Sequence, residues 1–221
     1  MLAACPGPGN NPDVSLTAQD TEACSDLSCP VAVGSHNDLN LRTRPGTFDE
    51  SKLVLTSSDE SVVKVSVRGN TDGFRDWKMV AVAPGHADLV VTDVDGTELR
   101  RESLEVAPAV GFTLRFVFGF DAGASFEDSQ VQGPLERAGY TEAWKIASDT
   151  QVTFGITPRS ADRAPMMGKF DYTFSSGPGM TVSDSFGLPF VEPTAAVPGE
   201  YAVDILTNVA GLQAKILFIA E

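Results

Sequence analysis

The sequence predicts an all-β protein made of two tandem antiparallel β-sandwiches. Three observations lead to this prediction. Short apolar runs rich in β-branched residues alternate with polar residues at a period of two. Gly and Pro, 20 and 14 of the 221 residues, separate these runs at the spacing of turns. The same pattern lies on both sides of Pro108, which marks a boundary between two domains.

Residues 1–30 lack this pattern and are expected to form a flexible tether. Residues 6–12 are rich in Pro, Gly and Asn, which keep a chain extended and solvated. Before them, Leu2-Ala3-Ala4-Cys5 resembles the lipobox of bacterial lipoproteins, in which a peptidase cuts before the cysteine and its sulfur carries diacylglycerol. That family also has a basic and an apolar region upstream, whereas only Met1 precedes Leu2 here. The alternative is a plain flexible N-terminus.

The other two cysteines predict a local disulfide. Cys24 and Cys29 enclose Ser25-Asp26-Leu27-Ser28, and no second cysteine pair completes a zinc site. A disulfide between these two leaves Cys5 as the remaining cysteine, which could carry a lipid. The disulfide also implies an oxidising compartment such as the periplasm or the cell exterior. A reduced, structural pair is the alternative.

Residues 31–107 are predicted to form the first sandwich. Asp95-Gly96 is a strong hairpin signal, because glycine adopts positive φ without a Cβ clash. The expected strands are Leu53–Leu55, Val62–Val67, Trp77–Val82, Ala87–Thr92 and Leu99–Val106.

Part of this domain resembles the group-two bacterial immunoglobulin-like family. The segments Leu55-Thr-Ser-Ser-Asp-Glu-Ser-Val-Val-Lys-Val65 and Val80-Ala-Val-Ala-Pro-Gly-His-Ala-Asp-Leu-Val-Val91 carry the resemblance. Two departures are the long polar loop from Arg68 to Asp76 and His86, where the family usually has Thr or Ser. The resemblance implies an immunoglobulin-like sandwich over residues 31–107 and a structural or binding module without catalysis.

Residues 108–221 are predicted to form a second immunoglobulin-like sandwich. Pro198-Gly199 repeats the corner formed by Pro84-Gly85 in the first domain, although sequence similarity between the halves is weak. Residues 119–139 form a polar insertion, and a loop of that length is usually functional or disordered. The expected strands are Phe112–Phe118, Ala143–Ala147, Gln151–Ile156, Lys169–Phe174, Tyr201–Ile205 and Leu212–Ile219.

The charge balance excludes several classes of partner. Sixteen Lys and Arg against 30 Asp and Glu give a net charge of −14. Nucleic-acid binding needs clustered basic residues, and anionic lipid also attracts basic segments, so neither partner is expected. No apolar run approaches the roughly 18 residues that a membrane-spanning helix needs. The membrane is therefore expected to be reached only through a lipid anchor.

The sequence lacks recognisable catalytic motifs, so we predict no catalytic residues, cofactor or metal. It has no Gly-x-Ser-x-Gly elbow, no His-Glu-x-x-His and no phosphate-binding glycine loop. His36 and His86 are interpreted as surface or turn residues. Asp93–Glu98 has a superficial calcium-loop pattern, but a hairpin turn explains it better because the twelve-residue spacing is missing.

The weak candidates for recognition are Phe74, Arg75 and Trp77 in the first domain. Aromatic residues beside arginine are typical of binding hot spots, and loops at a sandwich end often bind partners. The alternative for Trp77 is an inward-facing core residue at the start of a strand.

Together these features predict a non-catalytic, extracytoplasmic lipoprotein at the bacterial outer membrane or cell surface. It would act as a structural, adhesive or partner-binding module for a protein or glycan of the cell envelope. One alternative is a carbohydrate-binding accessory module, which needs Trp77, Trp144 or Tyr140 exposed. The other is an enzyme with a carboxylate pair in a deep cleft.

Overall fold

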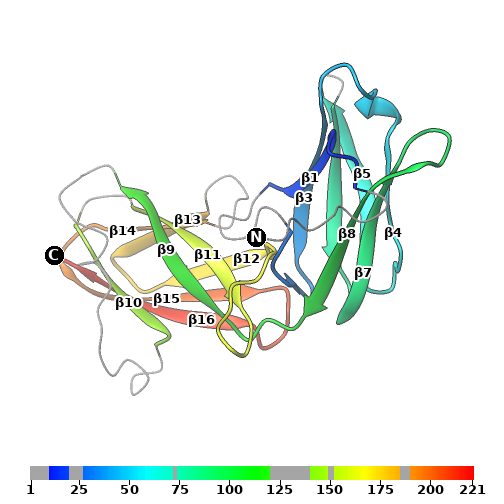
Figure 1. The fold of residues 1–221 in the computed structure, drawn as a ribbon. Helices are drawn as coiled ribbons and strands as arrows, with labels where there is room; N and C mark the ends of the chain where they lie inside the picture. The colour runs from blue at the N-terminus through cyan, green and yellow to red at the C-terminus, as the bar shows by residue number, and fades with distance from the viewer. Residues whose placement is uncertain (1–9, 20–26, 72–73, 120–139, 149–151, 185–189) are drawn as a thin grey trace, which may run out of the picture. The chain divides into compact units, whose positions relative to one another are not determined.

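The chain folds into two compact units of β-strands (Figure 1). The computed structural model describes residues 10–19, 27–71, 74–119, 140–148, 152–184 and 190–221. Unit 1 comprises Met1–Pro108 together with Pro165–Gly168. Unit 2 comprises Ala109–Ala164 and Lys169–Glu221. The predicted insertion at 119–139 lies outside the described residues apart from its first position.

The described residues of unit 1 form eight strands in two sheets. One sheet has the order β1-β3-β6-β5 and the other β2-β8-β7-β4. All neighbouring strands are antiparallel except β2 and β8, which pair in parallel. The strands are β1 (Val14–Ala18), β2 (Val31–Ala32), β3 (His36–Thr43), β4 (Val54–Ser57), β5 (Val63–Thr71), β6 (Phe74–Ala81), β7 (Gly85–Thr92) and β8 (Glu98–Ala107), with a 3-10 turn, η1, at Glu50–Lys52.

In unit 2, too, the part of the chain that the structure describes forms eight strands in two sheets. Their orders are β13-β14-β11-β9 and β10-β16-β15-β12, and only β10 and β16 pair in parallel. The strands are β9 (Gly111–Gly119), β10 (Glu142–Ile146), β11 (Val152–Arg159), β12 (Tyr172–Ser176), β13 (Met180–Asp184), β14 (Phe190–Ala195), β15 (Gly199–Thr207) and β16 (Gln213–Ala220).

The two units share one topology. Each strand of unit 1 corresponds to the strand of unit 2 that comes eight later, with the same neighbours and the same single parallel pair. Two four-stranded sheets, one carrying a parallel edge strand beside the last strand, form an immunoglobulin-like sandwich. The predicted all-β fold of two tandem immunoglobulin-like sandwiches is therefore confirmed.

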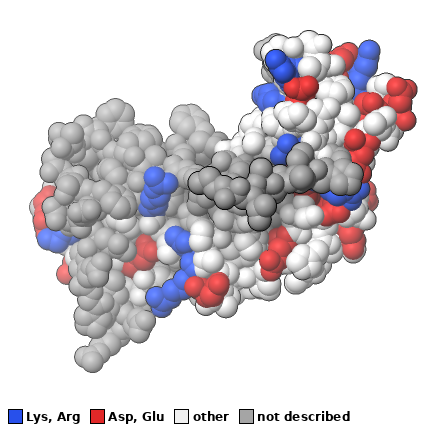
Figure 2. Space-filling view, viewed as in Figure 1, with Lys and Arg blue, Asp and Glu red and all other residues white. Residues whose placement is uncertain are grey.

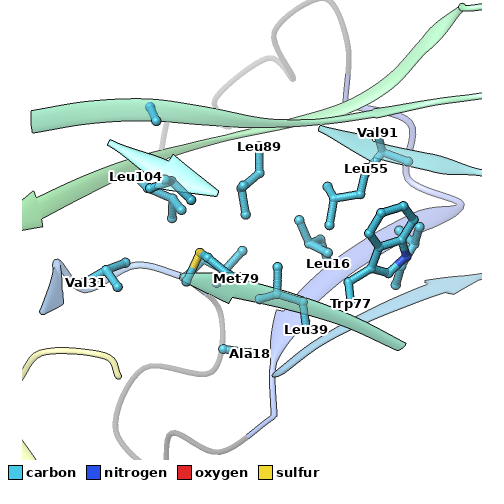
Figure 3. Close-up of a cluster of buried hydrophobic side chains, with 14 of the residues drawn as sticks. Leu16, Ala18, Val31, Leu39, Leu55, Trp77, Met79, Leu89, Val91 and Leu104 are labelled. Carbon is cyan, nitrogen blue, oxygen red and sulfur yellow. The ribbon is translucent and has the colours of Figure 1, made fainter. Parts of the chain in front are cut away.

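The core of unit 1 follows from alternation along the strands. In β7 every second residue is buried, so one face of the strand turns inward and the other toward solvent. Figure 3 shows Leu39 and Met79 from one sheet pointing toward Leu55 and Leu89 from the other. Burying a side chain of this size contributes about 1.5–3 kcal/mol, so these contacts hold the two sheets together.

The two Pro-Gly corners each begin the equivalent strand. Gly85 starts β7 and Gly199 starts β15. Gly85 has φ of +152°, and a Cβ built there would lie 3.0 Å from Cγ2 of Val62. A larger residue would therefore be strained and crowded at this corner, which explains why the sequence has glycine there.

Two segments differ from the sequence prediction. The expected tether, residues 1–30, contains strand β1 of unit 1, in which Val14, Leu16 and Ala18 are buried in the core of that unit. Alternating apolar residues after the Pro-rich stretch form this strand, so the predicted tether of residues 1–30 was too long. Residues 165–168, expected in the second domain, belong to unit 1.

Residues 165–168 add to the edge of the β2-β8-β7-β4 sheet. Val31 and Met167 form a parallel bridge, with hydrogen bonds from Ala32 N–H to the Met167 oxygen and from Met167 N–H to the Pro30 oxygen, both 2.8 Å. Met167 is fully buried in the core of unit 1. An apolar side chain from the second half of the sequence is thus part of the core of the first sandwich.

Candidate functional site: a polar groove on unit 2

Trp77 does not belong to a surface recognition site. It is 4% exposed and lies in the core of unit 1, where Figure 3 shows it beside Leu16 and Leu39. The core alternative for this residue is therefore the correct one, because alternation along β6 turns Trp77, Met79 and Ala81 inward together. The side chains of Phe74 and Arg75 lie outside the described residues.

The second tryptophan is also a core residue. Trp144 is 1% exposed and packs edge-on against Phe154, with ring centroids 5.0 Å apart. The carbohydrate-binding alternative therefore cannot use either tryptophan as a stacking platform. Tyr140 is half-buried, and the ammonium of Lys215 lies 5.3 Å from its ring centroid.

Glu142 joins the two sheets of unit 2 through one carboxylate oxygen. Its Oε2 accepts hydrogen bonds from the backbone N–H of Leu114 on β9 and from Nε1 of Trp144, both at 3.0 Å. Glu142 is only 8% exposed, and burial raises its pKa against the opposing effect of these two hydrogen bonds. We interpret Glu142 as a structural clasp, because its carboxylate is enclosed by protein.

The residues considered for metal binding have other roles. The Oδ1 atom of Asp93 accepts backbone hydrogen bonds from Asp95 at 3.0 Å and Thr97 at 2.8 Å, so this carboxylate closes the β7–β8 turn. The hairpin interpretation of 93–98 is confirmed by the antiparallel pairing of β7 with β8. Within the described ranges, no cluster of three or more potential metal ligands occurs.

Cys29 is bonded in a disulfide. Cys24, its predicted partner, and Cys5, the predicted lipid acceptor, lie outside the described residues, so the pairing and the lipid stay predictions. Of the two histidines, His86 is exposed on β7 and His36 is half-buried at the start of β3. In the part of the chain that the structure describes, no helix is long and apolar enough to cross a membrane.

Acidic and basic side chains are interspersed on the described surface. Figure 2 shows both signs close together on the face in view. On unit 1, Arg101 contacts Asp88 at 2.7 Å and Glu98 at 2.6 Å. Hydrogen bonds from Ser103 and, to a lesser extent, from Arg101 lower the pKa of Asp88. These ion pairs link side chains on the outer face of β7 and β8. Because they are exposed, they contribute little to the free energy of unfolding.

An open groove of about 430 Å³ crosses the outer face of the β10-β16-β15-β12 sheet. It is mostly polar, and its side chains come from three neighbouring strands and the residue before β10. The lining residues are Thr141, Ser175, Asp204, Leu206, Gln213, Ala214 and Lys215. No sequence motif marked this groove, because its residues are spread over 75 positions from 141 to 215.

The strand register places these side chains in two rows. In the first row Ser175 lies opposite Asp204, and Asp204 lies opposite Lys215. In the second row Leu206 lies opposite Gln213. Because neighbouring strands are about 4.8 Å apart, side chains that face the same way in one row form a continuous surface.

Thr141 extends the first row beyond β16. Its backbone N–H and its hydroxyl both donate to the carbonyl oxygen of Lys215, at 2.8 and 3.0 Å. The hydroxyl is thereby held at the edge of the groove while its oxygen lone pairs stay available to accept. The groove thus contains hydroxyl, carboxylate, amide and ammonium groups on a rigid sheet.

Comparisons with known proteins identify no family for this chain. No family model matches it, and no curated protein matches it. Solved structures that it resembles include domains 5–6 of the S-layer protein SbsC, with 16% identity over 93% of this chain and 99% of that chain and a TM-score of 0.35. They also include the Escherichia coli adhesin FdeC, with 12% identity, coverage of 99% and 66%, and a TM-score of 0.34.

A third such structure is the D0-D1 domain of intimin, with 10% identity, coverage of 93% and 97%, and a TM-score of 0.33. Likenesses of this degree assign neither a family nor an activity. The group-two family over residues 31–107 therefore stays a prediction. The immunoglobulin-like fold rests on the strand order itself.

Proposed function

We propose that this protein is a non-catalytic module of the bacterial cell envelope, held outside the cytoplasm by a lipid on Cys5. It presents binding surfaces on two rigid immunoglobulin-like sandwiches to a protein or glycan partner. The observation that carries the proposal is the disulfide at Cys29, because disulfides persist in oxidising compartments and are rare in the cytosol.

The duplicated topology supports a structural or binding role. Both sandwiches use their inward faces for packing, and their sheets hold outward side chains in a fixed register. Such scaffolds position surface groups without moving parts, which suits adhesion or partner binding. The sequence Leu2-Ala3-Ala4-Cys5, followed by residues rich in Pro and Gly, supports a lipid-bearing N-terminus with a short spacer.

The test is the location of the full-length gene product in its own host. We expect the protein in the membrane fraction, and we expect protease added to intact or outer-membrane-permeabilised cells to digest it while cytoplasmic proteins survive. Cys5→Ala should release it from the membrane fraction. The matched control, Cys29→Ala, should lower stability but leave the protein membrane-bound. A wild-type protein found soluble and protected inside the cytoplasm would overturn the proposal.

A further inference from the structure

We propose that the groove on unit 2 binds a neutral oligosaccharide. The inference rests on the proposed role as a binding module, and it names the class of partner for one surface. The groove differs from the aromatic platform that the sequence suggested. Polar side chains line the groove, whereas both tryptophans of the chain are buried in the cores.

The polar groups of the groove match those of a polyol. Asp204 only accepts hydrogen bonds, Lys215 only donates them, and Gln213 does both. A sugar hydroxyl also donates and accepts, so neighbouring hydroxyls on one ring can pair with a carboxylate and an ammonium at once. A ligand with donors only or acceptors only would leave part of this surface unpaired, which costs binding free energy.

These groups are available for a ligand. Among the described residues, the side chains of Ser175, Asp204 and Gln213 find no hydrogen-bond partner. Lys215 is steadied by the ring of Tyr140 without losing its donors. Leu206 is 42% exposed beside Gln213 and provides an apolar surface for the C–H groups of a sugar ring. The polar and apolar groups thus lie side by side, as a pyranose requires.

Charge favours a neutral saccharide over an anionic one. The groove contains one carboxylate, on Asp204, and one ammonium, on Lys215, so its own formal charge is balanced. The whole chain carries −14, and this surplus repels polyanions. Acidic polysaccharides and nucleic acids are therefore disfavoured at this surface.

The groove is also preorganised. Ser175, Asp204 and Lys215 stand on three hydrogen-bonded strands, and the residues that alternate with Asp204 and Lys215, such as Val203 and Ile216, are buried in the core of unit 2. Their backbones therefore do not need to be ordered when a ligand binds, which lowers the entropic cost of association.

The test is a set of chemical-shift titrations on the ¹⁵N-labelled full-length chain. The probes are cellohexaose, maltohexaose, chitohexaose and mannohexaose, with trigalacturonate as the anionic comparison. Each is used at about 5 mM, which detects dissociation constants as weak as millimolar. We expect at least one neutral probe to shift the amide signals of Ser175, Asp204, Gln213 and Lys215, and trigalacturonate to leave them unchanged.

Variants locate the site. Asp204→Asn keeps the shape of the side chain but removes its charge, and it should weaken binding of the active probe about tenfold or more. Gln213→Ala provides a second, independent loss of contact. Thr181→Ala, at an exposed position on β13 in the other sheet, is the matched control and should leave the affinity unchanged.

Three results would overturn the inference: no shift with any neutral probe, shifts that map outside the groove, or binding of trigalacturonate alone. Each of these leaves the cellular location of the protein unaffected, so failure of the saccharide site is distinguishable from failure of the proposed envelope function.

Discussion

The hydroxyl of Tyr201 donates a hydrogen bond of 2.9 Å to the carbonyl oxygen of Val197, four residues earlier in the chain. This bond ties the start of β15 to the corner that precedes it, as a tyrosine corner does in immunoglobulin folds. The equivalent position in unit 1, two residues after the corner glycine, is Ala87. Unit 1 instead holds the residues before its corner through the carbonyl oxygen of Val62, which accepts hydrogen bonds from the backbone N–H groups of Val82 at 2.8 Å and Ala83 at 3.4 Å. Two sandwiches of one topology therefore secure the same turn by different interactions.

Tyr201→Phe should lower the free energy of unfolding of unit 2 by about 1 kcal/mol, because it removes this hydrogen bond and keeps the ring. Urea denaturation measures the change. The matched control is Tyr140→Phe, since the half-buried Tyr140 makes no hydroxyl hydrogen bond among the described residues. That variant should be as stable as the wild type. Equal losses in both variants would contradict the assigned role of Tyr201.

Gly168→Ala should destabilise unit 1 by about 2–3 kcal/mol. Gly168 has φ of +128°, and a Cβ at this position would overlap Oγ and Cβ of Ser35. Gly177→Ala is the control, because nothing lies within 4 Å of a Cβ built there. Thermal unfolding of the two variants should differ clearly. If both melt like the wild type, residues 165–168 do not pack on unit 1 as described.

Met167→Ala should cost about 2–5 kcal/mol, as large-to-small substitutions in a core do. Because Met167 is fully buried in unit 1, the loss should fall on that unit alone. Hydrogen exchange should become faster in β3 and β6 and stay unchanged in β15. Met180→Ala, a buried residue of β13, should give the reverse pattern. Faster exchange confined to β15 in Met167→Ala would contradict its assignment to unit 1.

Asn37→Leu should stabilise unit 1 by about 1–3 kcal/mol. The Asn37 side chain is fully buried on β3, opposite Met79, and neither its amide nitrogen nor its amide oxygen has a hydrogen-bond partner among the described residues. An apolar side chain of similar size removes that desolvation cost. Asn40→Leu is the contrast, because Asn40 accepts hydrogen bonds from Gln19 and Arg42 and should not be improved. A destabilised Asn37→Leu, measured by urea denaturation, would show that the amide is satisfied.

We expect the free energy of unfolding to depend on pH through Glu142, and we expect the Glu142→Gln variant to lack this contribution. Burial raises the pKa of Glu142 in the folded protein above its value of about 4.3 in an unfolded chain. The folded state therefore binds this proton more tightly, so the stabilisation is complete below the unfolded pKa and is lost as pH rises through the folded pKa. The stability of the wild type relative to Glu142→Gln should thus fall from pH 4 toward neutrality.

Denaturant titrations at several pH values measure this difference. Glu105→Gln, at an exposed position on β8, is the control and should track the wild type across the range. A difference between wild type and Glu142→Gln that rises with pH would contradict the burial of Glu142.

The regular part of the fold could be predicted from the sequence because alternation is local. The run from Ala87 to Thr92 and the corner at Pro84-Gly85 each contain their own signal, and both appear in the structure as β7 and its start. Strand β1 was missed because the Pro-rich residues before Val14 suggested a tether for the whole N-terminal region.

Long-range pairing could not be predicted in the same way. Nothing in the sequence near Met167 indicates that it bridges Val31, more than a hundred residues earlier. The groove had no signal for a similar reason. Asp204 and Lys215 are ordinary surface residues in their own strands, and only the sheet register aligns them with Ser175. For Trp77 the sequence contained a misleading signal. Its neighbours Phe74 and Arg75 suggested a binding loop, whereas the alternation along the strand places Trp77 in the core.

The proposed function requires a lipid-anchored, oxidised protein of the cell envelope. Intact mass spectrometry of the protein purified from its own host, with and without reduction, tests it most directly. The account predicts a mature chain that begins at Cys5 with the added mass of a diacylglycerol-type lipid, and two thiols that react with an alkylating reagent only after reduction. An unmodified chain that keeps Met1 and has three free thiols would contradict it.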